Sequence, residues 1–328
     1  MTSDQQDSFT QPESFRRDGF VVIPGVLTND RVEHHRSHLA KLAASYGVGR
    51  CTTGPEDILA SDALREFAIE VQFSEKLVEA IRAVVGPVVS YVPDLQLHHN
   101  KFGLAGPSQG WHLDCGSEID DLRNTYLYDD NYLFGKVGLV LQDNTADLGG
   151  GISVIPGSHR AFRHAGRVTG SLLYRTLYNR LNRHSPSSLS RREVRLSLTA
   201  GSAVYFDSRL LHRSTPPLAL APSAYHQAGQ CSELVTRTGH GKHILYWEAC
   251  TPVHAGSHLR NAARRAATEE ASLPADSSTP PFYTHYLSLR FPDDYPADYV
   301  TAARRSGVEV VSLDPESAAF WKRAAAST

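Results

Sequence analysis

The spacing of hydrophobic and polar positions changes near residue 88 of the chain. Before this point, two segments place an apolar residue at every third or fourth position, which is typical of one face of a helix. The first begins near Asp30, which forms a capping-box pattern with Glu33, and ends before Gly47. The second begins near Ser74 and ends at Gly86. We therefore expect helices in the N-terminal quarter of the chain.

Beyond residue 88, short apolar runs alternate with glycine and proline, which is typical of strands and turns. In the run 88–102 the polar residues Gln96, His98 and Asn100 share one face, as expected for a strand that lines a wet cavity. Further strands are predicted in the ranges 135–141, 149–160, 201–212 and 242–250, and an earlier one at 20–25. Many short strands predict a β-sandwich or barrel, with the N-terminal helices packed against it.

The pattern predicts a single domain over residues 1–328, because no stretch has the composition of a linker. Residues 1–14 are polar and are expected to be disordered. A helical buttress spans 15–87, the β core spans 88–250, and a C-terminal extension covers 251–328. The core is interrupted at 160–195 by a polar, helical insertion with nine arginines and one acid, Glu193. This insertion is either a solvated basic face or a lid that attracts an anionic substrate.

Composition excludes several classes of function. A net charge of -2 gives no general attraction to nucleic acid or to an anionic membrane surface. No apolar run reaches the ~18 residues of a membrane span, and the polar N-terminus has no signal-peptide core. The four cysteines are scattered and contain no CxxC pair, which favours reduced thiols and a cytoplasmic location. We expect a small molecule as the partner; the oligomeric state cannot be read from the sequence.

Candidate chemistry is concentrated in the stretch Trp111-His112-Leu113-Asp114. Among the 16 histidines, only His112 is followed two positions later by an acid. Residues i and i+2 of a strand point to the same side, so His112 and Asp114 can reach one metal ion. With a second imidazole they would form the two-histidine, one-carboxylate set of non-haem iron oxygenases, which leaves three coordination positions open.

Four stretches of the chain resemble the phytanoyl-CoA dioxygenase family of Fe(II)/2-oxoglutarate oxygenases, and they occur in the family's order between residue 15 and about residue 250. They are Arg17-Asp18-Gly19-Phe20-Val21-Val22-Ile23-Pro24-Gly25-Val26, Trp111-His112-Leu113-Asp114, Val154-Ile155-Pro156-Gly157-Ser158-His159-Arg160 and His212-Arg213-Ser214. The resemblance implies a double-stranded β-helix, the jelly roll also used by cupins, with a mainly β core and flanking helices.

The resemblance also implies the site and its chemistry. His112 and Asp114 would be the first two iron ligands, and His212 the third. Fe(II), 2-oxoglutarate and O2 would be the cofactors and cosubstrates, with succinate and CO2 as coproducts. Halogenating members of the family lack the carboxylate, so Asp114 favours hydroxylation, or another oxidation such as desaturation or ring formation, over halogenation.

The anchor for the far carboxylate of 2-oxoglutarate is where the sequence departs from the family. Members place an arginine about a dozen positions after the second histidine, because its planar fork binds a carboxylate through two hydrogen bonds. Here the candidates are Arg237 and Lys242, and the choice stays open, with His240 or no anchor as further alternatives. Ser214 matches the serine that contacts the cosubstrate in the family. Lys101 and the polar face of 88–102 are candidates to line the same cavity.

Two other functions stay open at the level of sequence. The displaced anchor is compatible with a catalytically silent, cupin-like binding protein that keeps the fold. A cupin dioxygenase that needs no 2-oxoglutarate is the third alternative. The sequence does not identify the substrate, because the loops that would contact it carry no readable pattern.

Overall fold

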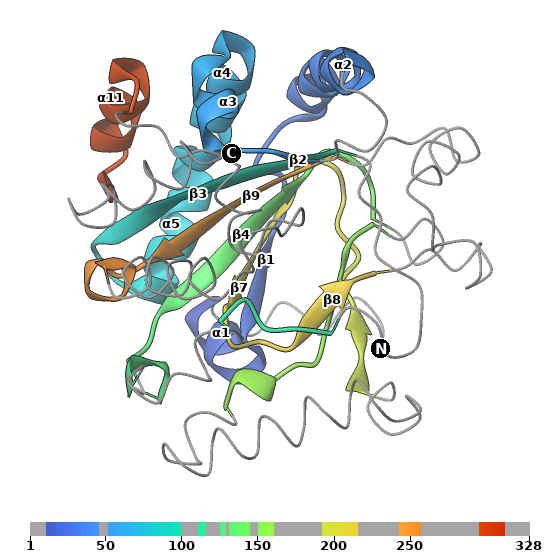
Figure 1. Cartoon of the computed structure of the whole chain (residues 1–328). Coiled ribbons are helices and arrows are strands. Elements are labelled where there is room, and N and C mark those ends of the chain that lie inside the picture. Colours follow the sequence, from blue (N-terminus) through green and yellow to red (C-terminus); the bar gives the residue numbers. More distant parts are fainter. Residues whose placement is uncertain are drawn as a thin grey trace, which may run out of the picture.

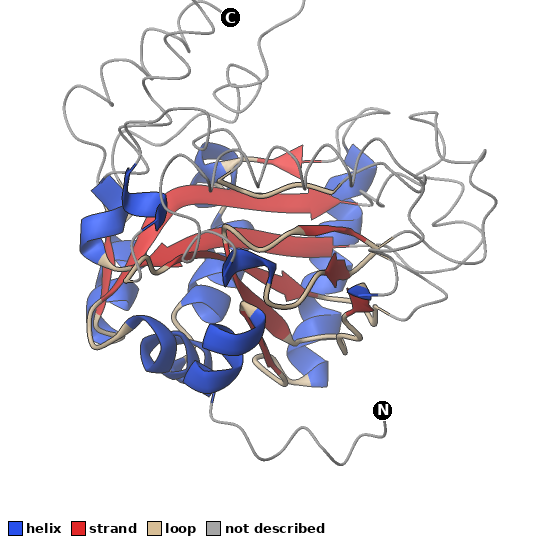
Figure 2. Cartoon of the chain, turned by 90° about the horizontal axis from the view of Figure 1, so that it is seen from below, coloured by secondary structure: helices blue, strands red, loops and turns tan. Residues whose placement is uncertain are grey.

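The computed structural model of the chain contains two β-sheets that face each other, with helices on the outer side of the larger sheet (Figure 1). It describes residues 11–45, 52–99, 111–115, 125–128, 131–144, 150–160, 192–215, 243–256 and 295–311. The strands lie at the centre of the molecule and the helices around them (Figure 2). The predicted mainly β core with flanking helices is therefore confirmed.

Within the described residues, the larger sheet has seven strands in the order β1-β7-β4-β9-β3-β10, with β2 paired to β3. Its pairs are antiparallel except for β10 with β3, which are parallel. The strands are β1 (Phe20–Ile23), β2 (Thr52–Thr53), β3 (Val89–His99), β4 (Phe134–Val140), β7 (Ala203–Asp207), β9 (His243–Cys250) and β10 (Val308–Val310). A bulge in β3 between Val92 and Gln96 shifts its register against β9.

The smaller sheet has three strands in the order β6-β5-β8, all antiparallel. They are β5 (Ile152–Val154), β6 (Val194–Arg195) and β8 (His212–Ser214). Figure 1 shows β8 set apart from the long strands β3, β9 and β4. Short 3-10 helices lie at η2 (Thr125–Tyr128) and η3 (Ser158–Arg160). The described strands form a jelly-roll sandwich that does not close into a barrel.

The helices of the N-terminal part are α1 (Gln11–Asp18), α2 (Asn29–Ser45), α3 (Pro55–Ala60), α4 (Asp62–Gln72) and α5 (Glu75–Val85). The two predicted helices are present as α2 and α5, and Gly86 ends α5 with a φ of 105°. Helix α2 begins at Asn29, so Asp30 lies inside its first turn and does not cap it. The expected disorder of residues 1–14 is wrong from Gln11 onward, because buried Phe15 anchors α1 by stacking on Tyr205.

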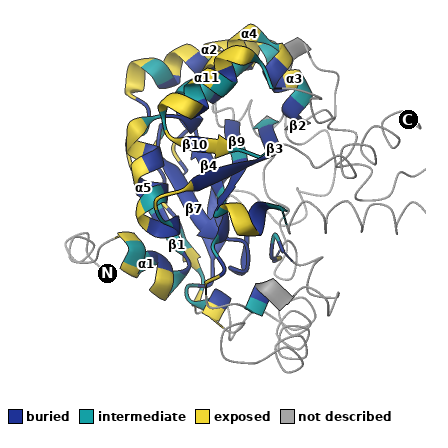
Figure 3. Ribbon diagram, turned by 90° about the vertical axis from the view of Figure 1, so that its left-hand side faces the viewer, coloured by how far each residue is buried: buried dark blue, intermediate teal, exposed yellow. Residues whose placement is uncertain are grey.

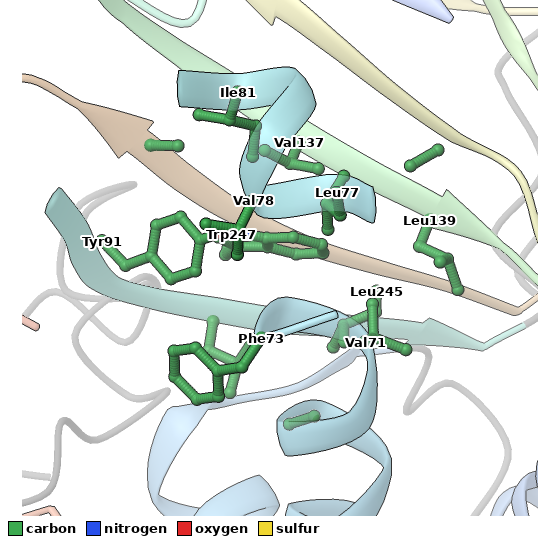
Figure 4. Close-up of a cluster of buried hydrophobic side chains, with 14 of the residues drawn as sticks. Val71, Phe73, Leu77, Val78, Ile81, Tyr91, Val137, Leu139, Leu245 and Trp247 are labelled. Atoms are coloured by element: carbon green, nitrogen blue, oxygen red, sulfur yellow. The ribbon is translucent and has the colours of Figure 1, made fainter. Parts of the chain in front are cut away.

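The main hydrophobic core lies between the helices and the outer face of the larger sheet (Figure 4). Leu77, Val78 and Ile81 of α5 pack over Val137 of β4 and Trp247 of β9 in this cluster. Alternation along each strand explains the arrangement, since every second side chain turns toward the helices. The outer faces of the helices are exposed, whereas the strands beneath them are buried (Figure 3).

The inner face of the larger sheet turns toward the smaller sheet. At one end, an apolar cluster joins the two sheets, and includes Val140, Val154, Phe206 and Ile244. Toward the other end of the fold, a second cluster surrounds Trp111 and Leu113 and includes Phe134 and Cys250. Between these two clusters, the inner face carries the polar side chains Lys136 on β4 and Glu248 on β9.

The chain returns to the N-terminal helices in its C-terminal extension. Helix α11 (Ala297–Arg305) contacts α4, and β10 then adds to the edge of β3. The hydroxyl of Tyr299 donates to Oε1 of Gln72 at 2.5 Å, and Arg65 forms an ion pair with Asp298 at 2.9 Å. The extension thus completes the main core.

Several predicted features fall outside the described residues. They are the predicted cavity residues Asn100 and Lys101, the candidate anchors Arg237, His240 and Lys242, and most of the insertion 160–195. The described end of that insertion is the strand β6, where Val194 and Arg195 pair with β5. Among the described helices, none combines the length and apolar character needed to cross a membrane.

Candidate metal centre

The segment that contains His112 lies beside β8, although the two are far apart in the sequence. His112 and His212 form an antiparallel bridge, in which each backbone N–H donates to the other residue's carbonyl oxygen, at 2.9 and 3.1 Å. Such a pair brings the two side chains to the same side of the strands. The imidazole ring centroids are 4.2 Å apart. Backbone pairing therefore sets the distance between the two histidines.

Asp114 completes a cluster of three potential metal ligands with these histidines. Its Oδ1 lies 3.7 Å from Nε2 of His112 and 3.5 Å from Nε2 of His212. One donor atom from each residue falls within 4.8 Å of the others. Two donors that each lie about 2.0–2.2 Å from one metal ion are at most about 4.4 Å apart, so the separations of 3.7 and 3.5 Å from Oδ1 suit a shared ion. Two imidazole nitrogens and one carboxylate oxygen suit non-haem iron.

The hydrogen bonds of His212 fix which of its nitrogens faces the cluster. Nδ1 lies 2.9 Å from the carbonyl oxygen of Leu210, and a carbonyl can only accept, so Nδ1 carries the proton. Nε2 then presents a lone pair toward Asp114. Burial, together with the nearby His112, lowers the pKa of His212 to about 4, so its imidazole is neutral at pH 7. A neutral imidazole with an oriented lone pair is the form that binds metals.

A stack of side chains holds the two ligand-bearing segments together from the other side of β8. The guanidinium of Arg213 lies over the ring of Trp111, 4.8 Å from its centroid. One terminal nitrogen, Nη2, contacts both carboxylate oxygens of Glu193, at 3.0 and 2.9 Å. Because Arg213 alternates with His212, this stack orients the strand without entering the metal cluster. It connects the segment that carries His112 and Asp114, strand β8 and the residues before β6.

A second buried arginine fixes the turn before β8. Arg209 binds Asp207 through two hydrogen bonds, at 2.9 and 2.7 Å, and both side chains are fully buried. It also donates to the carbonyl oxygens of Leu127 and Tyr132, at 3.1 and 3.4 Å. A buried pair of this kind needs such additional bonds to offset the loss of hydration. Arg209 therefore anchors the residues that precede β4 to the turn that leads into His212.

The inner faces of β3, β4 and β9 place polar side chains opposite the metal cluster. Nζ of Lys136 on β4 lies 3.9 Å from Oδ2 of Asp114 and 6.0 Å from the ring centroid of Tyr246 on β9. On β3, His98 packs edge-on against Tyr246, with ring centroids 4.9 Å apart. Oε1 of Gln96 accepts a hydrogen bond from Nε2 of His98, at 3.3 Å. The polar face predicted for residues 88–102 is thus present at Gln96 and His98.

Only some of the predicted site residues lie together in the structure. It brings His112, Asp114 and His212 together, and places Ser214 at an exposed position two residues beyond His212 on β8. Arg237 and Lys242 lie outside the described residues. Sequence reasoning missed Lys136, although the signal was available: it is the one charged residue in the otherwise apolar strand β4. A lone charge in a buried strand indicates that one face of the strand meets something polar.

Comparisons with known proteins identify the family of the chain. Residues 15–218 match the model of the family described as phytanoyl-CoA dioxygenase (PhyH). Ectoine dioxygenase of Streptomyces avermitilis is 24% identical over 223 residues, which cover 62% of this chain and 71% of that protein. Ectoine dioxygenase of Stutzerimonas stutzeri is 25% identical over 224 residues, which cover 62% of this chain and 69% of that protein.

Solved structures also align with this chain. HygX from Streptomyces hygroscopicus, with nickel and 2-oxoglutarate bound, aligns with a TM-score of 0.47 and 17% identity over 75% of this chain and 88% of that one. SnoN, a non-heme alpha-ketoglutarate-dependent epimerase from nogalamycin biosynthesis, aligns with a TM-score of 0.44 and 15% identity over 83% and 91% of the two chains.

Proposed function

Because this chain belongs to the phytanoyl-CoA dioxygenase (PhyH) family, we propose that it is an Fe(II)/2-oxoglutarate-dependent oxygenase that hydroxylates or otherwise oxidises a small molecule. The observation that supports this most is the cluster of His112, Asp114 and His212, whose donor atoms converge on one point. The relatives named ectoine dioxygenase support a small-molecule substrate. They do not identify it at this level of identity.

The three residues fit a ferrous ion. His212 is held neutral with Nε2 toward the centre, and Asp114 supplies the anionic oxygen. When bound, iron and 2-oxoglutarate supply the oxidising chemistry, with O2 consumed and succinate and CO2 released. The protein binds the substrate, orients the reacting C–H bond and excludes water. Because the carboxylate of Asp114 would fill one coordination position of a bound iron, we favour hydroxylation over halogenation.

The cosubstrate contacts extend this proposal to three further residues. We place Ser214 beside the cosubstrate, because it follows His212 by two positions on β8 and shares its side of the strand. For the far carboxylate, Arg237 and Lys242 are the candidate anchors. Lys242 directly precedes β9, the strand that pairs with β4 in front of the metal cluster. Arg237 offers the better hydrogen-bonding geometry for a carboxylate.

The test is optical and needs no knowledge of the substrate. Purified protein with Fe(II) and 2-oxoglutarate, kept free of oxygen, is expected to develop a weak charge-transfer band in the visible region. Asp114→Ala should lose most of the band, because one of three protein ligands is gone. If the unchanged protein forms no band and binds no iron, the chain is a silent binding protein and the proposal fails. Oxygen uptake without succinate would instead indicate a cupin dioxygenase that needs no 2-oxoglutarate.

Separate variants then assign the anchor. We expect one of Arg237→Ala and Lys242→Ala to raise the concentration of 2-oxoglutarate needed for half of the band by at least about tenfold, since a charge-assisted bond is lost. The other variant serves as its control. If neither variant changes the 2-oxoglutarate concentration needed for half of the band, both residues are excluded as anchors.

A further inference from the structure

Lys136 lies at the metal cluster but is not one of its ligands. It sits on the inner face of β4, between Phe134 and Gly138 along the same face. Its ammonium is 3.9 Å from Oδ2 of Asp114, the carboxylate oxygen that does not face the histidines. The two oxygens of Asp114 therefore have different surroundings: Oδ1 faces both Nε2 atoms, and Oδ2 faces a cation.

Burial strengthens the attraction between the ammonium of Lys136 and the carboxylate of Asp114. The side chains of Lys136 and Asp114 are only 12% and 13% exposed. Opposite charges at this separation attract each other much more strongly away from bulk water than at the surface. The ring of Tyr246 stands near the ammonium, and Gly138 leaves room for that ring, because a Cβ there would lie 2.8 Å from it. The position of the ammonium is thus built into the inner face of the sheet.

We propose that Lys136 is a positioning residue that holds the carboxylate of Asp114 with Oδ1 toward the metal and Oδ2 turned away from it. This inference rests on the proposed function, because it concerns how Asp114 binds iron. A carboxylate can bind a metal through one oxygen or through both. Attraction of Oδ2 to Lys136 opposes the two-oxygen mode.

The number of open coordination positions depends on this choice. Two histidines and one carboxylate oxygen leave three positions of an octahedron open. The cosubstrate 2-oxoglutarate would take two of them by chelation, and O2 would need the third. If Asp114 used both oxygens, only two positions would stay open. 2-Oxoglutarate could still occupy those two positions, but Oδ2 would crowd it and O2 would have no position left, so loss of Lys136 should impair binding of the cosubstrate and O2 more than binding of the metal.

The experiment compares Lys136→Met with the unchanged protein, using Co(II) as a spectroscopic probe and Fe(II) for the charge-transfer band, both without oxygen. We expect Lys136→Met to bind Co(II) within a few-fold of the parent but with an altered visible spectrum. The midpoint for 2-oxoglutarate should rise by about tenfold or more, as is common when a residue that orients a metal ligand is removed. Lys136→Arg should restore much of the parent behaviour, because the cation is retained.

Two further variants serve as controls. Lys41→Met makes the same substitution at an exposed position of α2 and should change neither the spectrum nor the midpoint. Glu248 on β9 lies opposite Lys136 in the strand register, so Lys136 has a second acidic neighbour. If Lys136 serves only to balance that acid, Glu248→Gln should correct the defect of Lys136→Met. Such correction would contradict a role through Asp114.

Pyruvate separates this role from a direct anchor for the cosubstrate. It chelates iron through the same 2-oxo acid group but lacks the far carboxylate. A residue that positions Asp114 should weaken pyruvate and 2-oxoglutarate by similar factors, whereas an anchor should weaken 2-oxoglutarate alone. The second pattern would overturn the inference, as would an unchanged Co(II) spectrum with an unchanged midpoint.

Failure of Lys136→Met to fold and failure of the unchanged protein to bind metal have different consequences. If Lys136→Met does not fold, Lys136→Gln keeps a polar side chain of similar length, and the same two readouts decide with that variant. If the unchanged protein binds neither Co(II) nor Fe(II), the proposed function itself has failed. A normal parent and a normal Lys136→Met would refute only the inference about Lys136.

Discussion

Two groups that are not potential metal ligands contact the side chains of the metal cluster. The carbonyl oxygen of Leu210 orients His212, and the ammonium of Lys136 faces the outer oxygen of Asp114. Neither neighbour is implied by the His112 to Asp114 spacing. Residues that orient ligands in this way commonly change metal affinity or activity by about 10–100-fold when they are replaced. The site therefore extends beyond the three residues of its motif.

Gly138 gives a residue-scale prediction that is independent of any ligand. A Cβ at this position would lie 2.8 and 3.1 Å from two ring carbons of Tyr246. That ring also packs against His98, so it cannot move without cost. We expect Gly138→Ala to lower the free energy of unfolding by about 1–3 kcal/mol, as for other overpacked cores. Urea unfolding monitored by circular dichroism would measure this change.

A double-mutant cycle tests the cause. In a Tyr246→Ala background the ring is absent, and the added methyl group has space. The cost of Gly138→Ala should then become small, which appears as a coupling between the two sites. An equal cost in both backgrounds would show that the strain arises from the backbone and not from the ring.

At the scale of elements, helices α2 and α4 are joined by a titratable cluster. Nε2 of His35 lies 2.9 Å from Oε2 of Glu70, and Arg31 donates to the same carboxylate at 2.8 Å. Burial lowers the pKa of His35, despite the opposing hydrogen bond to Glu70. For Glu70, burial would raise the pKa, but the bonds from Arg31 and His35 more than offset this and lower it.

Both shifts predict that acid weakens the contact between α2 and α4. The folded protein binds a proton at His35 more weakly than the unfolded chain, so stability falls as the pH drops below about 6.5, the ordinary pKa of histidine. Glu70 adds a further loss when the pH falls through the lower pKa it has in the folded protein. We expect His35→Gln to reduce the decrease in Tm between pH 7.5 and 5.5.

The matched control is His38→Gln, the same substitution at an exposed position of α2. It should leave the slope of Tm against pH unchanged. The interpretation would be wrong if His35→Gln and the parent lost stability equally over this range, because the slope would then come from other groups.

The elements also show how far the sequence could predict this fold. Helix α5 and strand β4 were predictable, because their spacing of apolar residues is local and regular. Strand β10 was not predictable, since three residues next to a helix acquire their structure only by pairing with β3, over 200 positions earlier. Helix α1 was missed because its contact with the core depends on one residue, Phe15.

The same physical distinction applies to the site. The spacing of His112 and Asp114 is a local pattern, so it could be read directly. His212 could be assigned only from the order of the family's motifs, because its neighbour across the bridge is 100 positions away. Lys136 stands out in the sequence as the one charged residue of β4, but its contact with Asp114 could not be predicted, since the sequence does not say which distant side chain it meets. The parts that were missed are contacts between distant segments.

At the scale of the molecule, one hydrophobic core joins the N-terminal helices, the larger sheet and the C-terminal extension. Phe15 of α1, Trp247 of β9 and Tyr299 of α11 all belong to it. Segments that share one core are expected to unfold together. The inner face of the same sheet carries the metal cluster, so the stability of the core and the geometry of the site depend on the same strands.

Substitutions of Tyr299 test whether these segments unfold together. It is buried in α11, packs edge-on against Phe73 with ring centroids 5.0 Å apart, and donates to Gln72. Tyr299→Ala should cost about 3–5 kcal/mol, as expected for loss of a buried aromatic ring. Tyr299→Phe should cost only about 1–3 kcal/mol, because the ring stays and the amide of Gln72 loses one partner.

Because the core is shared, the loss of stability in these variants should shift the whole unfolding transition. Guanidinium unfolding followed by tryptophan fluorescence and by far-UV circular dichroism should give coincident curves for both variants. An early, separate phase in Tyr299→Ala alone would instead mean that α11 and β10 detach as an independent unit, and that the larger sheet is stable without them.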